Sequence, residues 1–153
     1  SQMTTFPVTA IIDASLVGDV YVIGATTTDL FDVNAGESDV FVIKYSGDDG
    51  DVVWSRQIGS SSHDFPSHVA VDNNFNVFVV GSTTGALNTT DDDNDNDNNN
   101  TNTQCFVAKY SSNGVLLWLR QFGTHDNDVA GFSINDSEGN VVVYGYSHID
   151  SSN

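Results

Sequence analysis

Cysteine, basic residues and long apolar runs are scarce or absent in this chain. The sequence has one cysteine, Cys105, so no disulfide can form within the chain. No apolar stretch reaches the roughly eighteen residues of a membrane-spanning helix, so no membrane insertion is expected. Lysine and arginine together number four, against 21 aspartates and glutamates, for a formal net charge of −17. Nucleic acids and anionic membranes are bound through basic contacts, so neither is expected as a partner.

The residues that are abundant favour strands. Valine occurs twenty times and leucine six times, and threonine, phenylalanine and tyrosine are plentiful. β-branched and aromatic side chains suit a pleated, half-buried surface, which predicts an all-β fold. The acidic surface is interpreted first as a solubilising coat, and second as a weak attractor of Ca²⁺. No other cofactor is expected.

The sequence repeats itself. Phe41–Tyr45 recurs as Phe106–Tyr110, and the segment from Val53 to Gly59 recurs as the segment from Leu117 to Gly123. From each of those glycines, five residues lead to an aspartate, eight more lead to a second aspartate, and nine more lead to another glycine, Gly81 or Gly145. A third copy of the last piece, Asp19–Gly24, stands near the start of the chain. Identical spacings at consecutive steps indicate a repeat architecture.

Each period holds four short apolar runs separated by turn residues. In one period these runs are Phe41–Tyr45, Val52–Ile58, Ser67–Val71 and Val77–Gly81. Asn113-Gly114 predicts a hairpin with a type I′ turn. Runs that are apolar at every position, such as Val77–Val80, indicate strands that are covered on both faces. Four-stranded sheets covered on both faces are typical of stacked β-propeller blades, and a two-sheet sandwich, which would alternate more cleanly, is the alternative.

These residues resemble the SBBP (seven-bladed β-propeller) repeat family. Its repeat has a phenylalanine-rich strand ending in lysine, a Trp-x-Arg strand ending in glycine, and an Asp-x-x-Gly-Asn hairpin that leads into a valine-rich strand. Residues 136–140 match the hairpin, whereas Asp72–Asn76 has Phe75 in place of its glycine, and the copy near the start is two residues longer there. The resemblance implies a propeller fold and no particular activity, since the family is defined by its blades.

The expected organisation is about two and a half blades in a ring that this chain leaves incomplete. Residues 1–37 are interpreted as the last strands of a partial blade with a connector, 38–87 as a blade, 88–103 as a low-complexity Asp/Asn-rich insertion, and 104–153 as a blade. The insertion accounts for eight extra residues and is expected to form a disordered loop. Its alternating aspartates are a weak candidate calcium site, which lacks the turn glycine and the final glutamate of a calcium loop: Asp93, Asp95 and Asp97.

All four basic residues stand at repeat positions: Lys44, Lys109, Arg56 and Arg120. We expect them to be structural, pairing with aspartates or loop carbonyls between neighbouring blades, with their stems on aromatic residues (Tyr45, Tyr110, Trp54 and Trp118). An anion-binding ring is the alternative, which the acidic surface opposes. The repeated aspartates Asp64, Asp128, Asp72 and Asp136 are expected to accept backbone N–H groups in turns. A glycosidase pair is disfavoured, because catalysis needs two carboxylates in different environments.

The remaining polar residues suggest no reaction chemistry. The four histidines, His63, His68, His125 and His148, have no zinc-ligand spacing, and no nucleophile elbow or phosphate loop occurs. Cys105 is interpreted as a small buried hydrophobe. Three sequons make Asn88, Asn99 and Asn135 candidate glycosylation sites, which favours a secreted or surface protein.

The sequence therefore predicts a non-enzymatic, extracellular or cell-surface module: a scaffold, an adhesion domain or a filament component. The alternative is a carbohydrate-active or carbohydrate-binding propeller. The expected partners are protein neighbours, either further blades or identical subunits, with glycans as a second class. Bare apolar end faces lined by Val20, Val22, Val141 and Val143 are expected to require covering by such neighbours.

Overall fold

The computed structural model describes residues 6–12, 18–87, 102–124, 127–136, 138 and 140–148, with the side chains of 6–12, 132–135 and 148 left out. These residues form ten strands. In chain order they are β1 (Phe6–Ile12), β2 (Val20–Thr26), β3 (Asp39–Tyr45), β4 (Val52–Ile58), β5 (Asp64–Val71), β6 (Val77–Thr83), β7 (Gln104–Tyr110), β8 (Leu116–Phe122), β9 (Asn127–Asn135) and β10 (Val141–His148). The fold is all-β, as the composition predicted. Among the described residues no helix could span a membrane.

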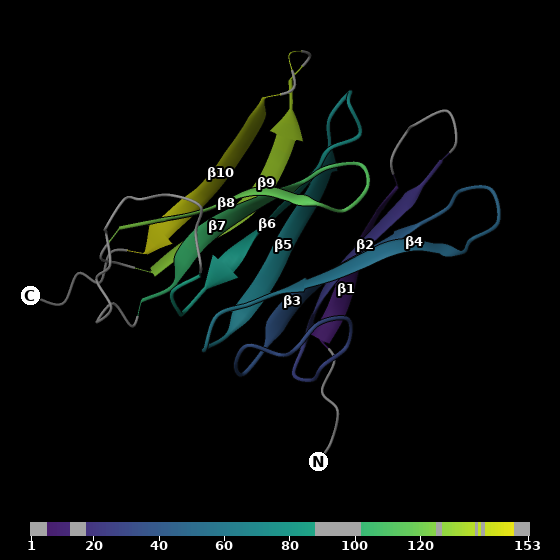
Figure 1. Cartoon of the computed structure of the whole chain (residues 1–153). Helices are drawn as coiled ribbons and strands as arrows, with labels where there is room; N and C mark the ends of the chain where they lie inside the picture. Colours follow the sequence, from purple (N-terminus) through teal and green to yellow (C-terminus); the bar gives the residue numbers. More distant parts are fainter. Residues whose placement is uncertain are drawn as a thin grey trace, which may run out of the picture.

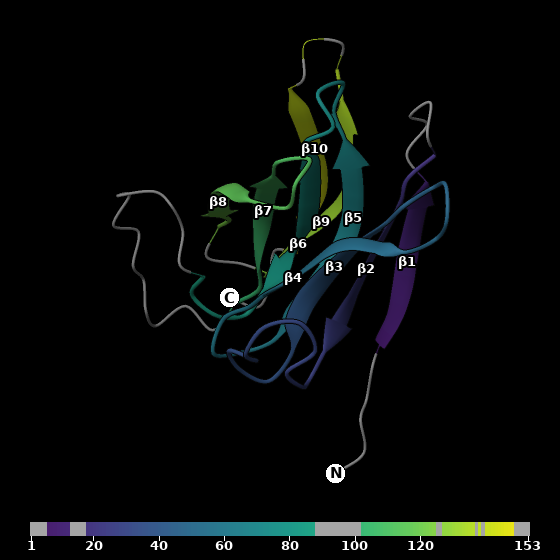
Figure 2. The ribbon, with the colours of Figure 1, turned by 45° about the vertical axis from the view of Figure 1, so that its right-hand side comes forward.

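The strands form three antiparallel sheets: β1-β2-β3-β4, β5-β6-β7-β8 and the pair β9-β10. We call these blade 1, blade 2 and the half-blade. In Figure 1 blade 1 lies at the right, blade 2 in the centre, and the half-blade at the upper left. Strand β5 packs against β1, β2 and β3, and β9 packs against β5, β6 and β7. Blade 2 therefore lies between the other two sheets; in Figure 2, turned by 45°, blade 1 is again at the right and the half-blade overlaps blade 2.

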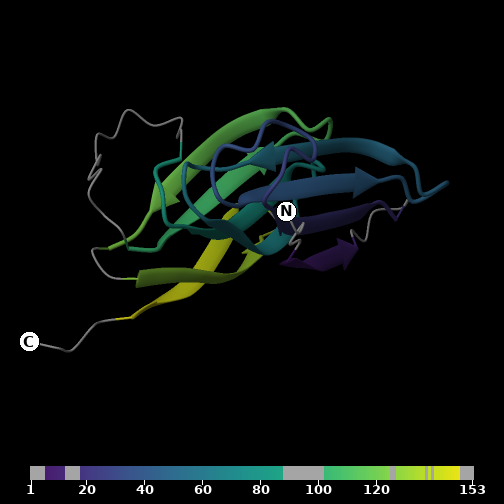
Figure 3. The same ribbon diagram turned by 90° about the horizontal axis from the view of Figure 1, so that it is seen from below.

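Two apolar clusters fill the spaces between the sheets. The first joins blade 1 to blade 2, and β6 contributes Val77 and Val79 to it. The second joins blade 2 to the half-blade, and β6 contributes Phe78 and Val80 to it. Consecutive residues of a strand point to opposite faces, so β6 is buried on both sides. This arrangement explains the uninterrupted apolar run and agrees with stacked blades. In Figure 3, β10 (yellow) lies at the left and β1 (purple) to the right of the centre.

The blade boundaries expected from the sequence differ from those of the sheets. Residues 38–87 hold β3 to β6, yet β4 and β5 belong to different sheets. The hydrogen-bonded units run instead from β1 to β4 and from β5 to β8, and the incomplete unit is the half-blade near the end of the chain. A repeat fixes the period but not the phase, because any four consecutive strands make one period. Strand β5 also begins earlier than expected, at Asp64 rather than Ser67.

The hairpin between β7 and β8 is not the predicted type I′ turn. Gly114 has a φ of 76°, but Asn113 is not among the described residues with positive φ. Gly114 N–H donates to the Ser111 carbonyl at 2.8 Å, and Ser111 N–H donates to the Val115 carbonyl at 2.8 Å. Three residues thus lie inside the closing bond, which is the loop built from a type I turn and a left-handed glycine.

One of the two apolar end faces is made by other residues than expected, while Val20 and Val22 of β2 lie on the outer face of blade 1, opposite the inward Tyr21 and Ile23. Val141 and Val143 pack on the second cluster, toward blade 2. The side chains of the half-blade that turn outward are Val142, Tyr144 and Tyr146, which are 50%, 63% and 67% exposed. At the other end, Val20 and Val22 are half-buried. The period-2 alternation of a strand accounts for the shift by one residue.

Candidate functional site at the blade junctions

The tryptophan and arginine of β4 bind a loop of the neighbouring blade. Trp54 Nε1 donates to the Ser112 carbonyl at 2.9 Å, and Arg56 Nε donates to the Gly114 carbonyl at 2.7 Å. The Arg56 guanidinium also lies over the Trp54 ring, 5.9 Å from its centroid. A Cβ at Gly114 would lie 2.8 Å from Trp54 Cδ2, so this loop needs glycine for space as well as for its positive φ. We call this contact the Trp–Arg clasp.

The second copy of the pair has the same local geometry on β8. The Arg120 guanidinium lies 5.9 Å from the centroid of Trp118, as in the first copy. Each arginine donates through Nη1 to the carbonyl of the preceding residue, at 2.6 Å from Arg56 and 3.1 Å from Arg120. Trp118 is half-buried against the second cluster, whereas Trp54 is buried. The chain therefore presents a preformed second pair on the side of the half-blade.

The two lysines pair within their own blade rather than between blades. Lys44 Nζ lies 2.8 Å from Asp19 Oδ2, and Lys109 Nζ lies 3.6 Å from Asp72 Oδ2. Their ammonium groups lie over the rings of Tyr21 and Phe78, not over Tyr45 or Tyr110. Each lysine is opposite that ring residue in the neighbouring strand, which accounts for the difference.

Asp72 organises the hairpin between β5 and β6. Its Oδ1 accepts the N–H groups of Asn74 at 2.9 Å and Asn76 at 2.8 Å, and its Oδ2 accepts Asn76 Nδ2 at 2.8 Å. Burial works to raise its pKa, but these hydrogen bonds and the charge of Lys109 outweigh burial and hold the pKa below its ordinary value. Asp136 makes the same three bonds in the next hairpin, to Glu138 and Asn140.

Asp64 is the first residue of β5 and Asp128 the second residue of β9, one at each junction, so the fold does not bring these two carboxylates together. Asp64 is 1% exposed, and its Oδ2 accepts Ser60 N–H at 2.6 Å and Ser60 Oγ at 3.0 Å. Burial raises its pKa, partly offset by those bonds. Asp128 likewise accepts the N–H of Thr124, and Thr124 Oγ1 lies 3.3 Å from each of its oxygens.

Asp39 is a buried carboxylate that the sequence reasoning overlooked. It is 1% exposed, and its Oδ2 accepts Ala35 N–H at 2.8 Å and Gln57 Nε2 at 3.0 Å. The Oδ1 atoms of Asp39 and Asp64 are buried without a hydrogen-bond partner. At the second junction the corresponding residue is Gln104, whose Oε1 accepts Gln121 Nε2 at 2.7 Å. Aligning the strands of the two blades would have found this position, seven residues before Ser46 in one copy and before Ser111 in the other.

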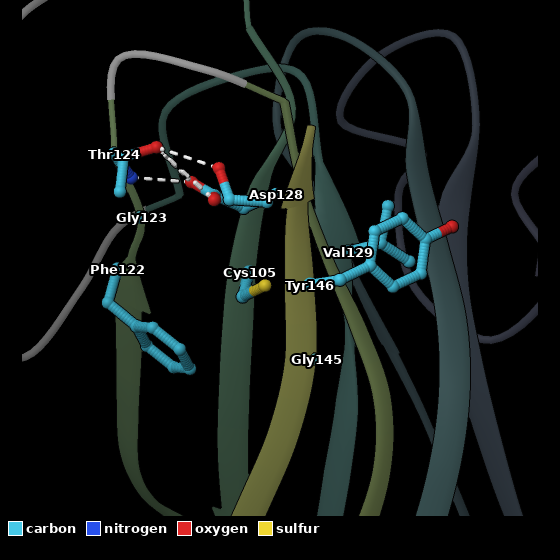
Figure 4. A pocket seen from close by; sticks show the side chains of 9 residues that line it. Cys105, Phe122, Gly123, Thr124, Asp128, Val129, Gly145 and Tyr146 are labelled. Atoms are coloured by element: carbon cyan, nitrogen blue, oxygen red, sulfur yellow. Dashed lines mark hydrogen bonds between the residues drawn. The ribbon is translucent and has the colours of Figure 1, made fainter. Parts of the chain in front are cut away.

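An open pocket lies at the second junction (Figure 4), lined by Cys105, Phe122, Gly123, Thr124, Asp128, Val129, Gly145, Tyr146 and Ser147. The Cys105 thiol is buried, as expected, and burial raises its pKa to about 11, so it is a neutral, poor nucleophile at neutral pH. Asp128 is tied to Thr124 by the dashed bonds in Figure 4. The pocket thus holds no activated nucleophile among the residues described.

His63 lies at the first junction. Its Nε2 pairs with Glu37, its Nδ1 lies 3.2 Å from Ser38 Oγ, and its ring stacks on Phe65. Ser38 is 1% exposed, so this arrangement holds a loop of blade 1 on β5 rather than presenting a nucleophile. No group of three metal-binding side chains occurs in the part of the chain that the structure describes. Asp93, Asp95, Asp97, Asn88, Asn99 and His125 fall outside it, as do the side chains of Asn135 and His148.

Repeat-equivalent residues are buried between blades and exposed at the two ends. Six residues after Gly81, Leu87 is 7% exposed inside the first cluster; six residues after Gly24, Leu30 is 44% exposed. The β6 residues Phe78, Val80 and Ser82 are 1%, 0% and 7% exposed, whereas their counterparts in β10 are at least half exposed. We call that set, Val142, Tyr144 and Tyr146, the β10 face. Both ends therefore have the composition of an inner junction.

Comparison with known proteins agrees with this architecture. Residues 53–87, which run from β4 through β6, match the family model of the SBBP β-propeller repeat. The chain therefore contains an SBBP-type β-propeller repeat. It is also 30% identical over 122 residues, 73% of its length, to an uncharacterized WD repeat-containing protein of Acanthamoeba polyphaga mimivirus. The match covers 9% of that relative. Residues 53–87 of this SBBP-repeat chain include the Trp–Arg pair, the junction aspartate Asp64 and the Asp72 hairpin.

Proposed function

We propose that this chain is a non-enzymatic structural and binding module of an extracellular or cell-surface protein. Its partners would be protein neighbours, either further blades of a longer chain or identical subunits, which pack against its two ends. The observation that carries this proposal is the exposure of repeat-equivalent residues: the β10 face has the composition of a junction, yet each of its side chains is at least half exposed. Apolar patches of this kind mark sites of protein interaction.

Three further observations support the proposal. β-Propeller repeats and the WD-repeat relative favour a binding module over an enzyme. The repeated aspartates have structural partners, and Asp64 and Asp128 sit apart at separate junctions. The net charge of −17 suits a surface exposed to salt, which screens self-repulsion, and the sequons suit a secreted protein.

The test is the association state of the purified chain. Sedimentation velocity at micromolar concentration should show reversible, concentration-dependent association. Val142→Lys and Tyr146→Lys should each abolish this association, because each substitution places a charge on the β10 face. Leu117→Lys is the matched control: Leu117 is 48% exposed but lies on β8, away from that face. A wild-type chain that stays a well-folded monomer contradicts the proposal.

The non-enzymatic part has its own test. Incubation with a panel of glycans and glycosidase substrates should give no turnover above that of a heat-unfolded sample. Turnover of any substrate would overturn this assignment and favour the carbohydrate-active alternative.

A further inference from the structure

The outer edge of β10 lacks, within the described residues, the third strand that both complete blades have. In blade 1, β2 is followed by β3, and in blade 2, β6 is followed by β7, each antiparallel. In the part of the chain that the structure describes, β10 pairs only with β9. An unpaired edge offers a row of backbone donors and acceptors to an incoming strand. The two complete blades show what such a strand must carry.

The first requirement is a phenylalanine opposite a glycine. Phe41 pairs with Gly24, and Phe106 pairs with Gly81. A Cβ placed on Gly81 would lie 2.6 Å from Phe106 Cε1 and 2.7 Å from its Cζ, so the ring occupies the space left by the missing side chain. Phe106 is 1% exposed there. Gly145 stands at the same position of β10 and is exposed.

The second requirement is a lysine three residues later. Lys44 and Lys109 follow their phenylalanines at that spacing and reach an aspartate of the hairpin that precedes β2 or β6. The hairpin before β10 presents Asp136 with the same hydrogen bonds as Asp72. By the register of blade 2, in which Lys109 is opposite Phe78, the incoming lysine would be opposite Val142.

We propose that the β10 edge binds an extended antiparallel strand of the form Phe-x-x-Lys, supplied by the third and fourth strands of an SBBP-type blade. The phenylalanine lies on Gly145, and the lysine approaches Asp136. Main-chain hydrogen bonds give the affinity, while the two side chains set the register. This inference rests on the proposed function, since it names a neighbour that would complete the half-blade beside the β10 face.

The experiment uses the full chain and a synthetic hairpin with the sequence of residues 39–58, which carries Phe41 and Lys44 and no cysteine. Binding is measured by calorimetry and located by backbone amide NMR shifts, which should concentrate in β10. Changing Phe41→Ala in the hairpin should weaken binding by about tenfold or more, as expected for a buried aromatic anchor. Asp48→Asn, in the turn of the same hairpin, is the control and should bind like the parent.

The lysine contact is tested by a double-mutant cycle. Lys44→Gln in the hairpin should weaken binding to the wild-type chain by about threefold to tenfold, and should have little effect on binding to the Asp136→Asn chain. The amide oxygen of that variant would retain an acceptor for the turn, so the chain should fold. Equal binding by the parent and Phe41→Ala hairpins, or shifts outside β10, would overturn the proposal. A chain that self-associates as described above but binds no hairpin would refute this inference and leave the proposed function standing.

Discussion

Phe75 has a backbone conformation that favours glycine, and this makes a specific prediction about stability. It is the one non-glycine residue with positive φ in the described part of the chain, at 61°. It closes the three-residue loop of the β5–β6 hairpin, in which Phe75 N–H donates to the Asp72 carbonyl at 2.9 Å. Gly114 holds the corresponding place in the β7–β8 hairpin, with a φ of 76°. The left-handed region costs an L-residue roughly 1–2 kcal/mol.

Substitution by glycine alone would not measure this strain, because it also removes the ring. The Phe75 side chain is 48% exposed, so about half of the roughly 1.5–3 kcal/mol for burying a phenylalanine is lost with it. Alanine removes the same ring but keeps the Cβ. The difference between the two variants therefore isolates the backbone. We expect Phe75→Gly to be more stable than Phe75→Ala by about 1 kcal/mol, since strain relief exceeds the extra entropy of unfolded glycine.

The measurement is urea unfolding of the two variants, together with the same pair at Asn74. Asn74 is exposed in the same loop without a positive φ, so there alanine should exceed glycine by about 0.5–1 kcal/mol. The order of stability should thus reverse between adjacent residues. In thermal unfolding, 1 kcal/mol corresponds to about 2–4 °C for a chain of this size. An alanine variant at position 75 that equals or exceeds the glycine variant would refute the reasoning.

Four further outcomes are expected. Gly114→Ala should destabilise the chain by about 1–3 kcal/mol in urea unfolding, because the new Cβ would clash with Trp54 and alanine is strained at the positive φ of this position. An unchanged unfolding midpoint would contradict the close packing of Trp54 on this loop. Asp72→Asn should destabilise the chain at pH 7 but much less at a pH below the lowered pKa of Asp72. The pKa of Asp64 is raised, so protonation of Asp64 on acidification should stabilise the wild-type chain. The Asp64→Asn chain should lack this gain in stability. Calcium should raise the melting temperature modestly, with a Kd no tighter than ~0.1–1 mM; tight stoichiometric binding in calorimetry would contradict this.

The sequence predicts the strands well and their grouping poorly, for one physical reason. The apolar runs of β3, β4 and β6 are local signals, and their burial on both faces follows from uninterrupted hydrophobicity. Which four strands form one sheet depends on hydrogen bonds that join β2 to β3 across a loop of twelve residues, 27–38, while the five residues 59–63 separate the sheets of β4 and β5. Connection length therefore misleads here, because the shorter connection is the one that changes sheet.

The positions of the charged residues were predicted better than their partners. The spacing of Arg56 places it on the outer strand of a blade, and the structure gives it a loop carbonyl of the next blade. For the lysines the partner lies within the blade, because a side chain on the third strand is nearer to the hairpin that precedes the second. Spacing alone does not show which of two acidic loops is closer. At the β10 end the outward residues are shifted by one position for a similar reason, since alternation gives two faces but not which one is outward.

The clearest break in the repeat symmetry bears on whether the chain is an enzyme. An active site on a repeat scaffold should break the symmetry with polar residues that a substrate can reach. Asp39, where the next copy has Gln104, is such a break, and it lies at the same junction as Asp64. Both aspartates are 1% exposed, however, and each is fixed by backbone N–H groups on one oxygen. Neither carboxylate therefore lies where a substrate could reach it without a rearrangement of the loops that bury it. The asymmetry therefore lies inside the junction between blades 1 and 2 and not on a surface open to a substrate.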